Sequence, residues 1–289
     1  MRPNVRAFTL TELLVVAAIL AILAAVLSPV FRSARGVAER THCAANFRSA
    51  MQATHLYLAD YDDRFMPVSY HPGEPADPAR DRTWVQVLMP YVRSFGVFRC
   101  PSDTTPRSPS DAVFDQDLVP GDTLSRFYRA SKRTNLGYNY LYFSPVTLGP
   151  TGWQVMPRNV SEIANLARAL VFVDSVKARG GSGQPEGGGS FVVVPPCRYQ
   201  NEAGRRIDTF GLGYGAVVYA PNPGWRPSDP LSPYQFGLAW PWHNGRASVV
   251  RFDGTTAAMT VEQLAEGCDV RDNWEGNILD ADRYLWDLR

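Results

Sequence analysis

The sequence predicts an α+β protein, in which a long N-terminal α-helix packs on the mainly antiparallel β-sheet of a head with loop insertions. An apolar run at residues 13–27 continues, past one proline, into a segment with helical periodicity. Near the other end, residues 247–252 and 255–259 have the composition of strands. The pair Asp253-Gly254 between them is typical of a β-hairpin, and we expect a two-residue type I′ turn there.

Residues 1–7 have the character of a short basic leader, and residues 8–31 that of a membrane helix. Helix of this length spans about 36 Å at about 1.5 Å per residue, enough to cross a hydrocarbon core of about 30 Å. Arg2 and Arg6 without a nearby acid favour a cytoplasmic N-terminus, which places the head outside the cytoplasm. Glu12 lies at the threshold of the apolar run, where a carboxylate costs less than at its centre.

The N-terminal segment with its apolar run has two simpler interpretations. One is a secretory signal peptide cleaved near Ser33 and Ala34, but a glutamate beside the apolar run is unfavourable for that purpose. The other is a plain signal anchor, which length alone does not exclude. The residues that separate these interpretations are Phe-Thr-Leu-Thr-Glu at 8–12.

With the basic leader before it and the membrane helix after it, this pentapeptide resembles the N-terminus of type IV pilin and type II secretion pseudopilin precursors. The resemblance implies that a prepilin peptidase cuts between Ala7 and Phe8 and that the new Phe8 amine is methylated. It also implies that Glu12 pairs with the amine of a neighbouring subunit. Ala7 departs from the family, which usually has glycine before the cut, whereas Pro29 falls where members often have a helix-loosening proline.

Helical periodicity resumes after Pro29 and predicts one helix over residues 8–63, with a weak point at Pro29 and Gly36. We expect its second half to pack on the head, residues 64–289, through one face. The residues of that face recur at three- and four-residue steps: Cys43, Phe47, Ala50, Met51, Thr54 and Leu58.

The head is expected to contain several short elements and two unusual insertions. Residues 179–190 carry six glycines, which predicts a flexible loop without a packed element. Residues 211–242 form an aromatic loop that either covers one edge of the head, the interpretation we favour, or binds a partner or glycan. The remaining elements are a helix at 84–92, a surface excursion at 101–125, strands at 137–143 and 169–174, and a turn or brief helix at 160–163.

Composition gives no support for nucleic-acid binding or catalysis. Of 29 basic residues two lie in the leader, which leaves 27 against 28 acidic residues and no basic surplus. No hydrolase, metalloprotease or phosphate-loop motif is present, so we expect neither an enzyme nor a cofactor. Asp60, Asp62 and Asp63 are weak candidates for a structural Ca²⁺ site, but their spacing fits a calcium loop poorly and a solvated helix end explains them better.

Four cysteines in an outward-facing protein permit up to two disulfides, and the sequence leaves three pairings open. Cys43 lies on the packing face of the helix and Cys100 on a loop plausibly near it, so we expect a bridge between these two. Two buried thiols are the alternative. A bond between Cys197 and Cys268 is less certain from the sequence.

A second resemblance involves the C-terminal third. His243, nine intervening residues and Asp253-Gly254 match the His-x9-Asp-Gly signature of a bacterial subgroup of pilin-like proteins, catalogued as a domain of unknown function. The intervening strand separates the two side chains by about 20 Å, so a structural role is expected rather than a catalytic pair. Asp253 and Gly254 would form the turn, and His243 would fasten the incoming loop to the sheet or the helix.

The sequence therefore predicts a minor or specialised structural subunit of a type II secretion pseudopilus or type IV pilus-like filament. It would be a single-pass protein of the inner membrane until assembled. Its expected partners are other pilin subunits, the prepilin peptidase, an inner-membrane assembly platform and lipid. The alternative is a membrane-anchored surface binding protein that does not polymerise.

Overall fold

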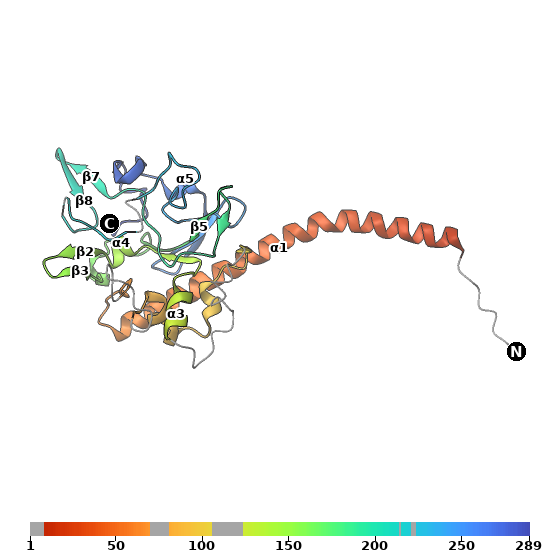
Figure 1. The fold of residues 1–289 in the computed structure, drawn as a ribbon, viewed down its shortest axis with the longest axis horizontal. Helices are drawn as coiled ribbons and strands as arrows, with labels where there is room; N and C mark the ends of the chain where they lie inside the picture. Colours follow the sequence, from red (N-terminus) through yellow and green to blue (C-terminus); the bar gives the residue numbers. More distant parts are fainter. Residues whose placement is uncertain (1–8, 70–80, 106–123, 214, 221–223) are drawn as a thin grey trace.

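The computed structural model describes residues 9–69, 81–105, 124–213, 215–220 and 224–289. One long helix projects from a head that contains the sheets and the C-terminus (Figure 1). The predicted α+β class, with a long N-terminal helix and antiparallel sheets, is confirmed. The predicted leader, residues 1–7, lies outside the described residues.

Helix α1 spans Leu10–Asp60, 51 residues or about 77 Å at about 1.5 Å per residue. It begins at a capping box between Thr9 and Glu12 and stays continuous through Pro29. It ends where predicted, because Asp62 and Asp63 both take positive φ and break the helical path. Our expectation of one long helix is therefore confirmed to within three residues at each end.

The second half of α1 packs on the head through the predicted face. All six residues predicted for that face are buried, together with Asn46, Ala53 and Tyr57. They lie against strands β9 (Ala247–Arg251) and β10 (Thr256–Met259). Cys43 is the first buried residue along α1, so the head begins to cover the helix there.

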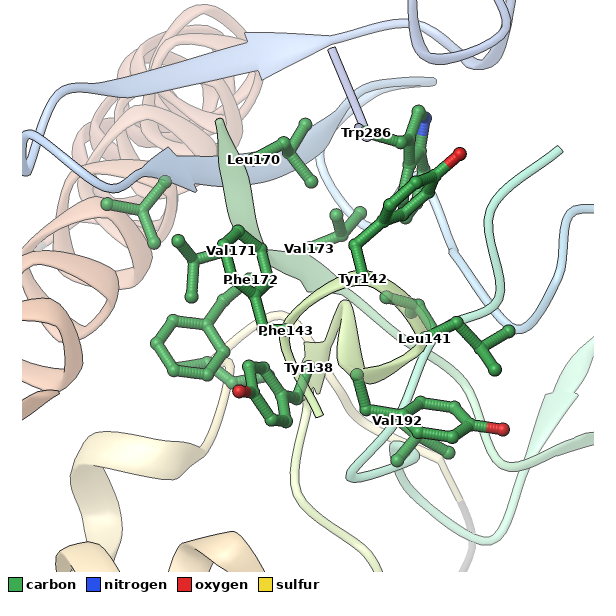
Figure 2. Close-up of a cluster of buried hydrophobic side chains, with 14 of the residues drawn as sticks. Tyr138, Leu141, Tyr142, Phe143, Leu170, Val171, Phe172, Val173, Val192 and Trp286 are labelled. Carbon is green, nitrogen blue, oxygen red and sulfur yellow. The ribbon is translucent and has the colours of Figure 1, made fainter. Parts of the chain in front are cut away.

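The main sheet has four antiparallel strands in the order β1-β4-β9-β10, where β1 is Leu136–Tyr138 and β4 is Leu170–Asp174. Strand β4 lies between β1 and β9, with Val173 opposite both Gly137 and Val249. All five residues of β4 are buried, which explains their uninterrupted apolar run up to Asp174. Figure 2 shows the side chains of Leu170, Val171, Phe172 and Val173 among aromatic rings from the neighbouring segments.

The predicted strand at 137–143 is wrong in its second half, because the strand ends at Tyr138 and Tyr140–Phe143 forms the short helix α4. Asn139 turns the chain, and its amide donates hydrogen bonds to the carbonyls of Leu170 and Trp286. A strand would direct alternate side chains away from the core. The α4 turn instead buries all four of its large side chains.

The remaining elements surround this sheet. The predicted helix at 84–92 is α2 (Trp84–Leu88) followed by a 3₁₀ turn, and the predicted turn at 160–163 is η4 (Val160–Glu162). A polar three-stranded sheet was not predicted. The other elements are η1 (Met89–Tyr91), η2 (Phe95–Phe98), α3 (Leu124–Ser131), β2 (Val146–Gly149), β3 (Gly152–Val155), β7 (Tyr199–Glu202), β8 (Arg205–Asp208), α5 (Val261–Leu264), η5 (Asp272–Trp274) and β11 (Asn277–Ile278).

The glycine-rich segment is packed, contrary to our expectation. Strand β5 (Ala178–Arg179) pairs with β6 (Pro185–Glu186) in a small antiparallel ribbon. At Gly189 a Cβ atom would lie 2.2 Å from the carbonyl oxygen of Thr134, so a larger residue does not fit. Glycine here permits close backbone packing as well as turns, which composition alone does not distinguish.

Among the described aromatic residues of 211–242, Trp225 is buried, Tyr219 is 45% exposed and the others are half-buried. Trp225 is buried and its indole Nε1 donates to the carbonyl of Val194. The indole of Trp242 donates to the carbonyl of Ser175, next to the end of β4. These contacts agree with the interpretation that the segment covers an edge of the head.

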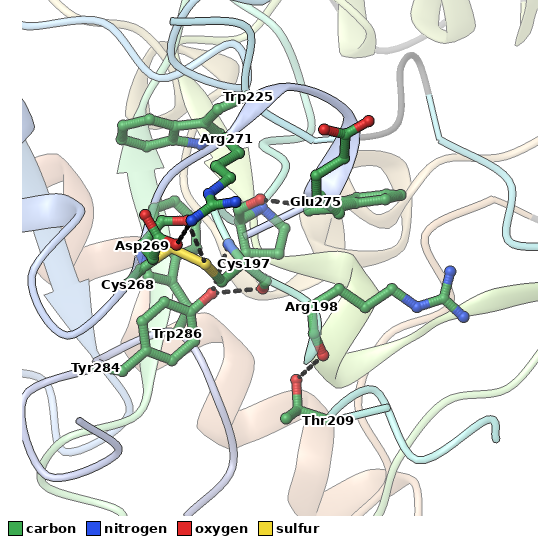
Figure 3. Close-up of a disulfide and its surroundings, with 12 residues drawn as sticks. Cys197, Arg198, Thr209, Trp225, Cys268, Asp269, Arg271, Glu275, Tyr284 and Trp286 are labelled. Carbon is green, nitrogen blue, oxygen red and sulfur yellow. Dashed lines mark hydrogen bonds and ion pairs between the residues drawn. A yellow bond between two sulfur atoms is a disulfide. The ribbon is translucent and has the colours of Figure 1, made fainter. Parts of the chain in front are cut away.

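The disulfide joins Cys197 to Cys268, across 71 residues of sequence (Figure 3). The Tyr284 hydroxyl lies beside it and donates to the carbonyl of Cys197 at 2.7 Å. Cys43 and Cys100 are both free thiols, so the predicted bridge between them is wrong. Both are buried, as in the alternative of two buried thiols. The side chains that face them account for this arrangement.

The β9–β10 hairpin is present, but its turn differs from the expected type I′. The Gly254 amide donates to the Arg251 carbonyl, and the Arg251 amide donates to the Thr255 carbonyl, both at 3.0 Å. Gly254 has φ +84°, whereas Asp253 is not among the described residues with positive φ. This is a type I turn followed by a left-handed glycine. The Asp253 carboxylate accepts a hydrogen bond from the Thr255 amide at 2.8 Å.

Replacing Gly254 by valine should destabilise the head by about 1–2 kcal/mol, because a β-branched residue is strained in the left-handed region. No heavy atom lies within 4 Å of the added Cβ position, so steric contact contributes nothing. Gly254→Asn is the matched control and should cost clearly less, since asparagine tolerates this conformation. Denaturant unfolding of both variants measures the difference, and equal losses would contradict the backbone explanation.

Candidate functional sites

The start of α1 is the first candidate site. The Glu12 carboxylate oxygen Oε2 accepts hydrogen bonds from the Thr9 amide at 2.9 Å and from the Thr9 hydroxyl at 2.7 Å. The Glu12 amide in turn donates to the Thr9 hydroxyl at 3.3 Å, which completes the capping box. Ala7 and Phe8, the predicted cleavage and methylation residues, lie outside the described residues.

The apolar half of α1 has no contact with the head. Its large aliphatic side chains, from Leu10 to Val30, are 50–77% exposed. Within the described parts of the chain, α1 is the one helix long and apolar enough to cross a membrane. An apolar surface this extensive needs lipid or other helices around it.

A second site lies where α1 meets the head. Four buried residues from four separate elements come together there: Cys43 of α1, Cys100 of the loop after η2, Asp174 at the end of β4, and His243 before β9. Their sulfur, nitrogen and oxygen atoms all lie within 4.8 Å of one another. We call these residues the neck cluster.

The imidazole of His243 is at the centre of the neck cluster. Its Nε2 atom lies 3.4 Å from the Cys100 sulfur and 3.4 Å from Asp174 Oδ2. The Cys43 sulfur lies 4.0 Å from Asp174 Oδ1. On the other side of the ring, His243 Nδ1 is 3.2 Å from the Ser102 hydroxyl oxygen.

Hydrogen bonds to the backbone position the segments that carry the neck cluster. The side-chain amide of Asn46 donates to the carbonyl of Arg99 at 2.8 Å, which holds the Cys100 loop against α1. Asp174 Oδ2 accepts a hydrogen bond from the Ser248 amide at 2.6 Å. His243 starts a tight turn in which both central residues, Asn244 and Gly245, have positive φ.

The electrostatic environment of the neck cluster favours the positively charged form of the His243 imidazole. Burial raises the pKa of the Asp174 carboxyl, and the adjacent His243 imidazole offsets part of that rise. Burial alone would lower the pKa of His243, but the hydrogen bonds and charges of Asp174 and Cys100 raise it to about 10. The hydrogen bond between the thiols raises the pKa of Cys43 and lowers that of Cys100.

Comparison with known proteins bears on the first site. Residues 2–28 match the family described as the prokaryotic N-terminal methylation motif. The chain has a prepilin-type N-terminus. The match covers residues 2–28, a motif typical of prepilin peptidase substrates, and together with the long apolar helix it fits a single-pass membrane anchor. No curated protein and no solved structure shows significant similarity to the chain.

The match does not extend to the C-terminal signature of this pilin-like chain. Its two halves lie apart in the structure: His243 precedes β9 and belongs to the neck cluster, whereas Asp253 follows β9 and binds Thr255. His243 thus contacts the end of β4 and, through Ser102, the Glu39 side chain of α1.

The predicted calcium candidates of the pilin-like chain do not form a common site among the described residues. The Asp60 carboxylate accepts a hydrogen bond from the Tyr91 hydroxyl at 2.8 Å. Asp62 lines the same surface pocket as Asp60, of about 570 Å³, which Asp63 does not line. The group of side chains that does converge is the neck cluster.

Sequence reasoning missed Asp174 and the association of the two cysteines with His243. Asp174 ends an apolar strand, a position that also suits an ordinary turn residue. One feature of the sequence could have pointed to Asp174. It directly follows four apolar residues of a buried strand, where an unpaired carboxylate would be costly.

Proposed function

We propose that this protein is a structural subunit, minor or specialised, of a type II secretion pseudopilus or a type IV pilus-like filament. After export with its head outside the cytoplasm, a prepilin peptidase cuts between Ala7 and Phe8. The inner-membrane assembly platform then transfers the subunit from lipid into a filament held together by helix packing. We propose no catalytic activity.

The observation that carries the proposal is the exposed apolar half of α1 directly behind the matched motif. The consecutive side chains of Leu13, Leu14 and Val15 are more than half exposed and point about 100° apart, so the apolar surface goes round the helix rather than along one stripe. A helix that is apolar all round suits a lipid environment and equally a bundle of like helices. Such a helix can exchange lipid neighbours for helix neighbours without exposing apolar surface to water.

The alternative, a surface binding protein that stays unpolymerised in the membrane, depended on an exposed aromatic segment. The burial of Trp225 removes one of those rings from the surface, which supports the filament proposal over it. Both share the membrane anchor, so the two differ in whether α1 contacts other helices.

Mass spectrometry of the mature protein should find N-methylated Phe8 as its first residue. The reason is the prepilin-type match over residues 2–28, which includes the expected cleavage point. In intact cells whose partner pilin also carries a cysteine on its apolar helix, oxidation of a Leu20→Cys variant should then give disulfide-linked adducts between the two subunits, because Leu20 is exposed on the apolar half.

Arg205→Cys, on an exposed edge strand of the head, is the matched control and should give no such adducts. A mature terminus near Ala34 would instead mark an ordinary signal peptide. A methylated terminus with no adducts at Leu20 would favour the unpolymerised membrane protein.

A further inference from the structure

We propose that the neck cluster is a zinc site, in which Cys43, Cys100, Asp174 and His243 bind one Zn²⁺ ion and fasten the stalk helix to the head. All four side chains belong to the types that bind zinc in proteins: thiolate, imidazole and carboxylate. They come from α1, the η2 loop, β4 and the turn before β9, so one ion would join four elements. The inference does not depend on filament assembly.

The spacing of the ligand atoms fits a tetrahedral ion. Zinc–sulfur bonds of about 2.3 Å and zinc–nitrogen or zinc–oxygen bonds of about 2.0–2.2 Å place tetrahedral ligands about 3.3–3.8 Å apart. The Nε2 atom of His243 lies 3.4 Å from both the Cys100 sulfur and Asp174 Oδ2. The Cys43 sulfur is 4.0 Å from Asp174 Oδ1, and no pair of ligand atoms exceeds 4.8 Å. Small side-chain shifts would bring all four to bonding distance.

The second ring nitrogen of His243, Nδ1, has the hydrogen-bond partner that a metal-bound imidazole needs. The Ser102 hydroxyl donates to the Glu39 carboxylate at 3.1 Å, so its oxygen is available to accept the Nδ1 proton of His243 at 3.2 Å. When the ion displaces the Nε2 proton, this relay would hold the remaining proton on Nδ1 and keep Nε2 directed at the other three ligands. Metal-binding histidines commonly hold their second nitrogen in this way.

The same geometry argues against a catalytic Cys-His-Asp triad. In such a triad the acid and the nucleophile contact opposite nitrogens of the imidazole. Here Asp174 and Cys100 both face Nε2, and Nδ1 faces Ser102. Four donors directed at one point are the arrangement of a coordination site.

A simple disulfide does not explain the site either. A bridge would need only the two thiols, whereas a buried carboxylate and a buried imidazole face the same point. The other two cysteines, Cys197 and Cys268, are joined in the structure and Cys43 and Cys100 are not. Thiolates also favour zinc over Mg²⁺ or Ca²⁺, which prefer oxygen ligands alone.

The neck cluster borders a surface pocket at His243. This pocket, of about 330 Å³ and lined by Glu39, Ser102 and Trp242 among others, has His243 in its wall. Binding would release the Nε2 proton of the charged His243 imidazole and the protons of the two thiols to water, which leaves a neutral imidazole and two thiolates on the metal. The chemistry is therefore that of a structural ion with four protein ligands.

The test uses the full-length chain purified in detergent with reductant and loaded with one equivalent of Zn²⁺, then with Co²⁺ in its place. We expect one ion per chain, and cobalt absorption bands of thiolate charge transfer and tetrahedral coordination. Cys43→Ser and His243→Gln should weaken binding by about tenfold or more. His42→Gln is the matched control, because His42 is the exposed neighbour of Cys43 on the same helix, and it should bind as the parent does.

A measurement on the unaltered chain keeps the test valid if those variants fail to fold. X-ray absorption of the zinc-loaded protein should show two sulfur and two nitrogen or oxygen ligands, at about 2.3 Å and about 2.0–2.2 Å. Chelation should lower the unfolding temperature of the head. Absence of zinc uptake, a ligand set without two sulfurs, or a Cys43–Cys100 disulfide that persists in peptide maps of zinc-loaded protein would overturn the proposal.

Discussion

Replacing Glu12 by glutamine should leave the protein inserted and processed but reduce its incorporation into filaments by about tenfold or more, which corresponds to about 1.4 kcal/mol. A carboxylate at the edge of a membrane helix is costly unless it is paired, so a neighbour's Phe8 amine would gain affinity from it. Glutamine keeps an acceptor for the Thr9 amide and removes the charge. Quantitative immunoblotting of sheared or cross-linked filaments measures the loss.

Thr9→Val is the matched control because it removes the hydroxyl side of the capping box and keeps the Glu12 charge. Loss of a cap costs about 1 kcal/mol of helix stability at one end of a long helix. We therefore expect Thr9→Val to assemble nearly normally. If Glu12→Gln assembled well and Thr9→Val did not, the role of Glu12 would be capping rather than subunit pairing.

Trp84→Ala should destabilise the head by about 3–5 kcal/mol, the range for truncation of a large buried aromatic residue. Trp84 is fully buried in α2, and its ring stacks on Phe172 of β4 with centroids 4.9 Å apart. Its indole also donates to the carbonyl of Phe191 at 2.6 Å, and truncation leaves that oxygen without this donor. Denaturant unfolding followed by near-ultraviolet circular dichroism gives the free energy of unfolding.

Two variants separate packing from the hydrogen bond. Trp84→Phe keeps most of the ring contacts and loses the indole donor, so it should cost about 1–3 kcal/mol. Leu148→Ala, at a position 52% exposed in β2, should change stability by no more than about 0.5 kcal/mol. A loss below about 1 kcal/mol for Trp84→Ala would contradict the central place of α2 in the core.

Periodicity predicted the elements whose patterns are long or strongly apolar. The face of α1 from Cys43 to Leu58 and the buried strand β4 follow directly from where apolar residues recur. The sheet β11-β7-β8 was not predicted because Tyr199–Glu202 and Arg205–Asp208 are largely polar. Its order depends on contacts between distant segments, such as the parallel pairing of Asn277 with Tyr199.

The two candidate sites differ in the same way. The N-terminal motif is a continuous run of residues, so its order in the sequence was sufficient. The neck cluster joins positions 43, 100, 174 and 243, and the topology alone brings them together. The place of Cys43 on the packing face and of Cys100 on a nearby loop predicted a bond between them. The carboxylate and imidazole that face the two thiols explain why proximity was predicted correctly and the bond was not.

The interval between Phe31 and Cys43 determines how far the head stands from a membrane. These twelve helical steps rise about 18 Å, whereas the headgroup layer on one side of a bilayer is about 5–8 Å thick. With the apolar half of α1 in hydrocarbon, Cys43 lies about 10 Å beyond the headgroups, and Glu39, which Ser102 of the head contacts, lies about 5 Å beyond them. The spacer is held by the ion pair of Arg35 with Glu39 at 2.8 Å and by the bond of Glu39 to Ser102. The head is thus carried on a rigid strut, and its surface is left free for other proteins rather than lipid.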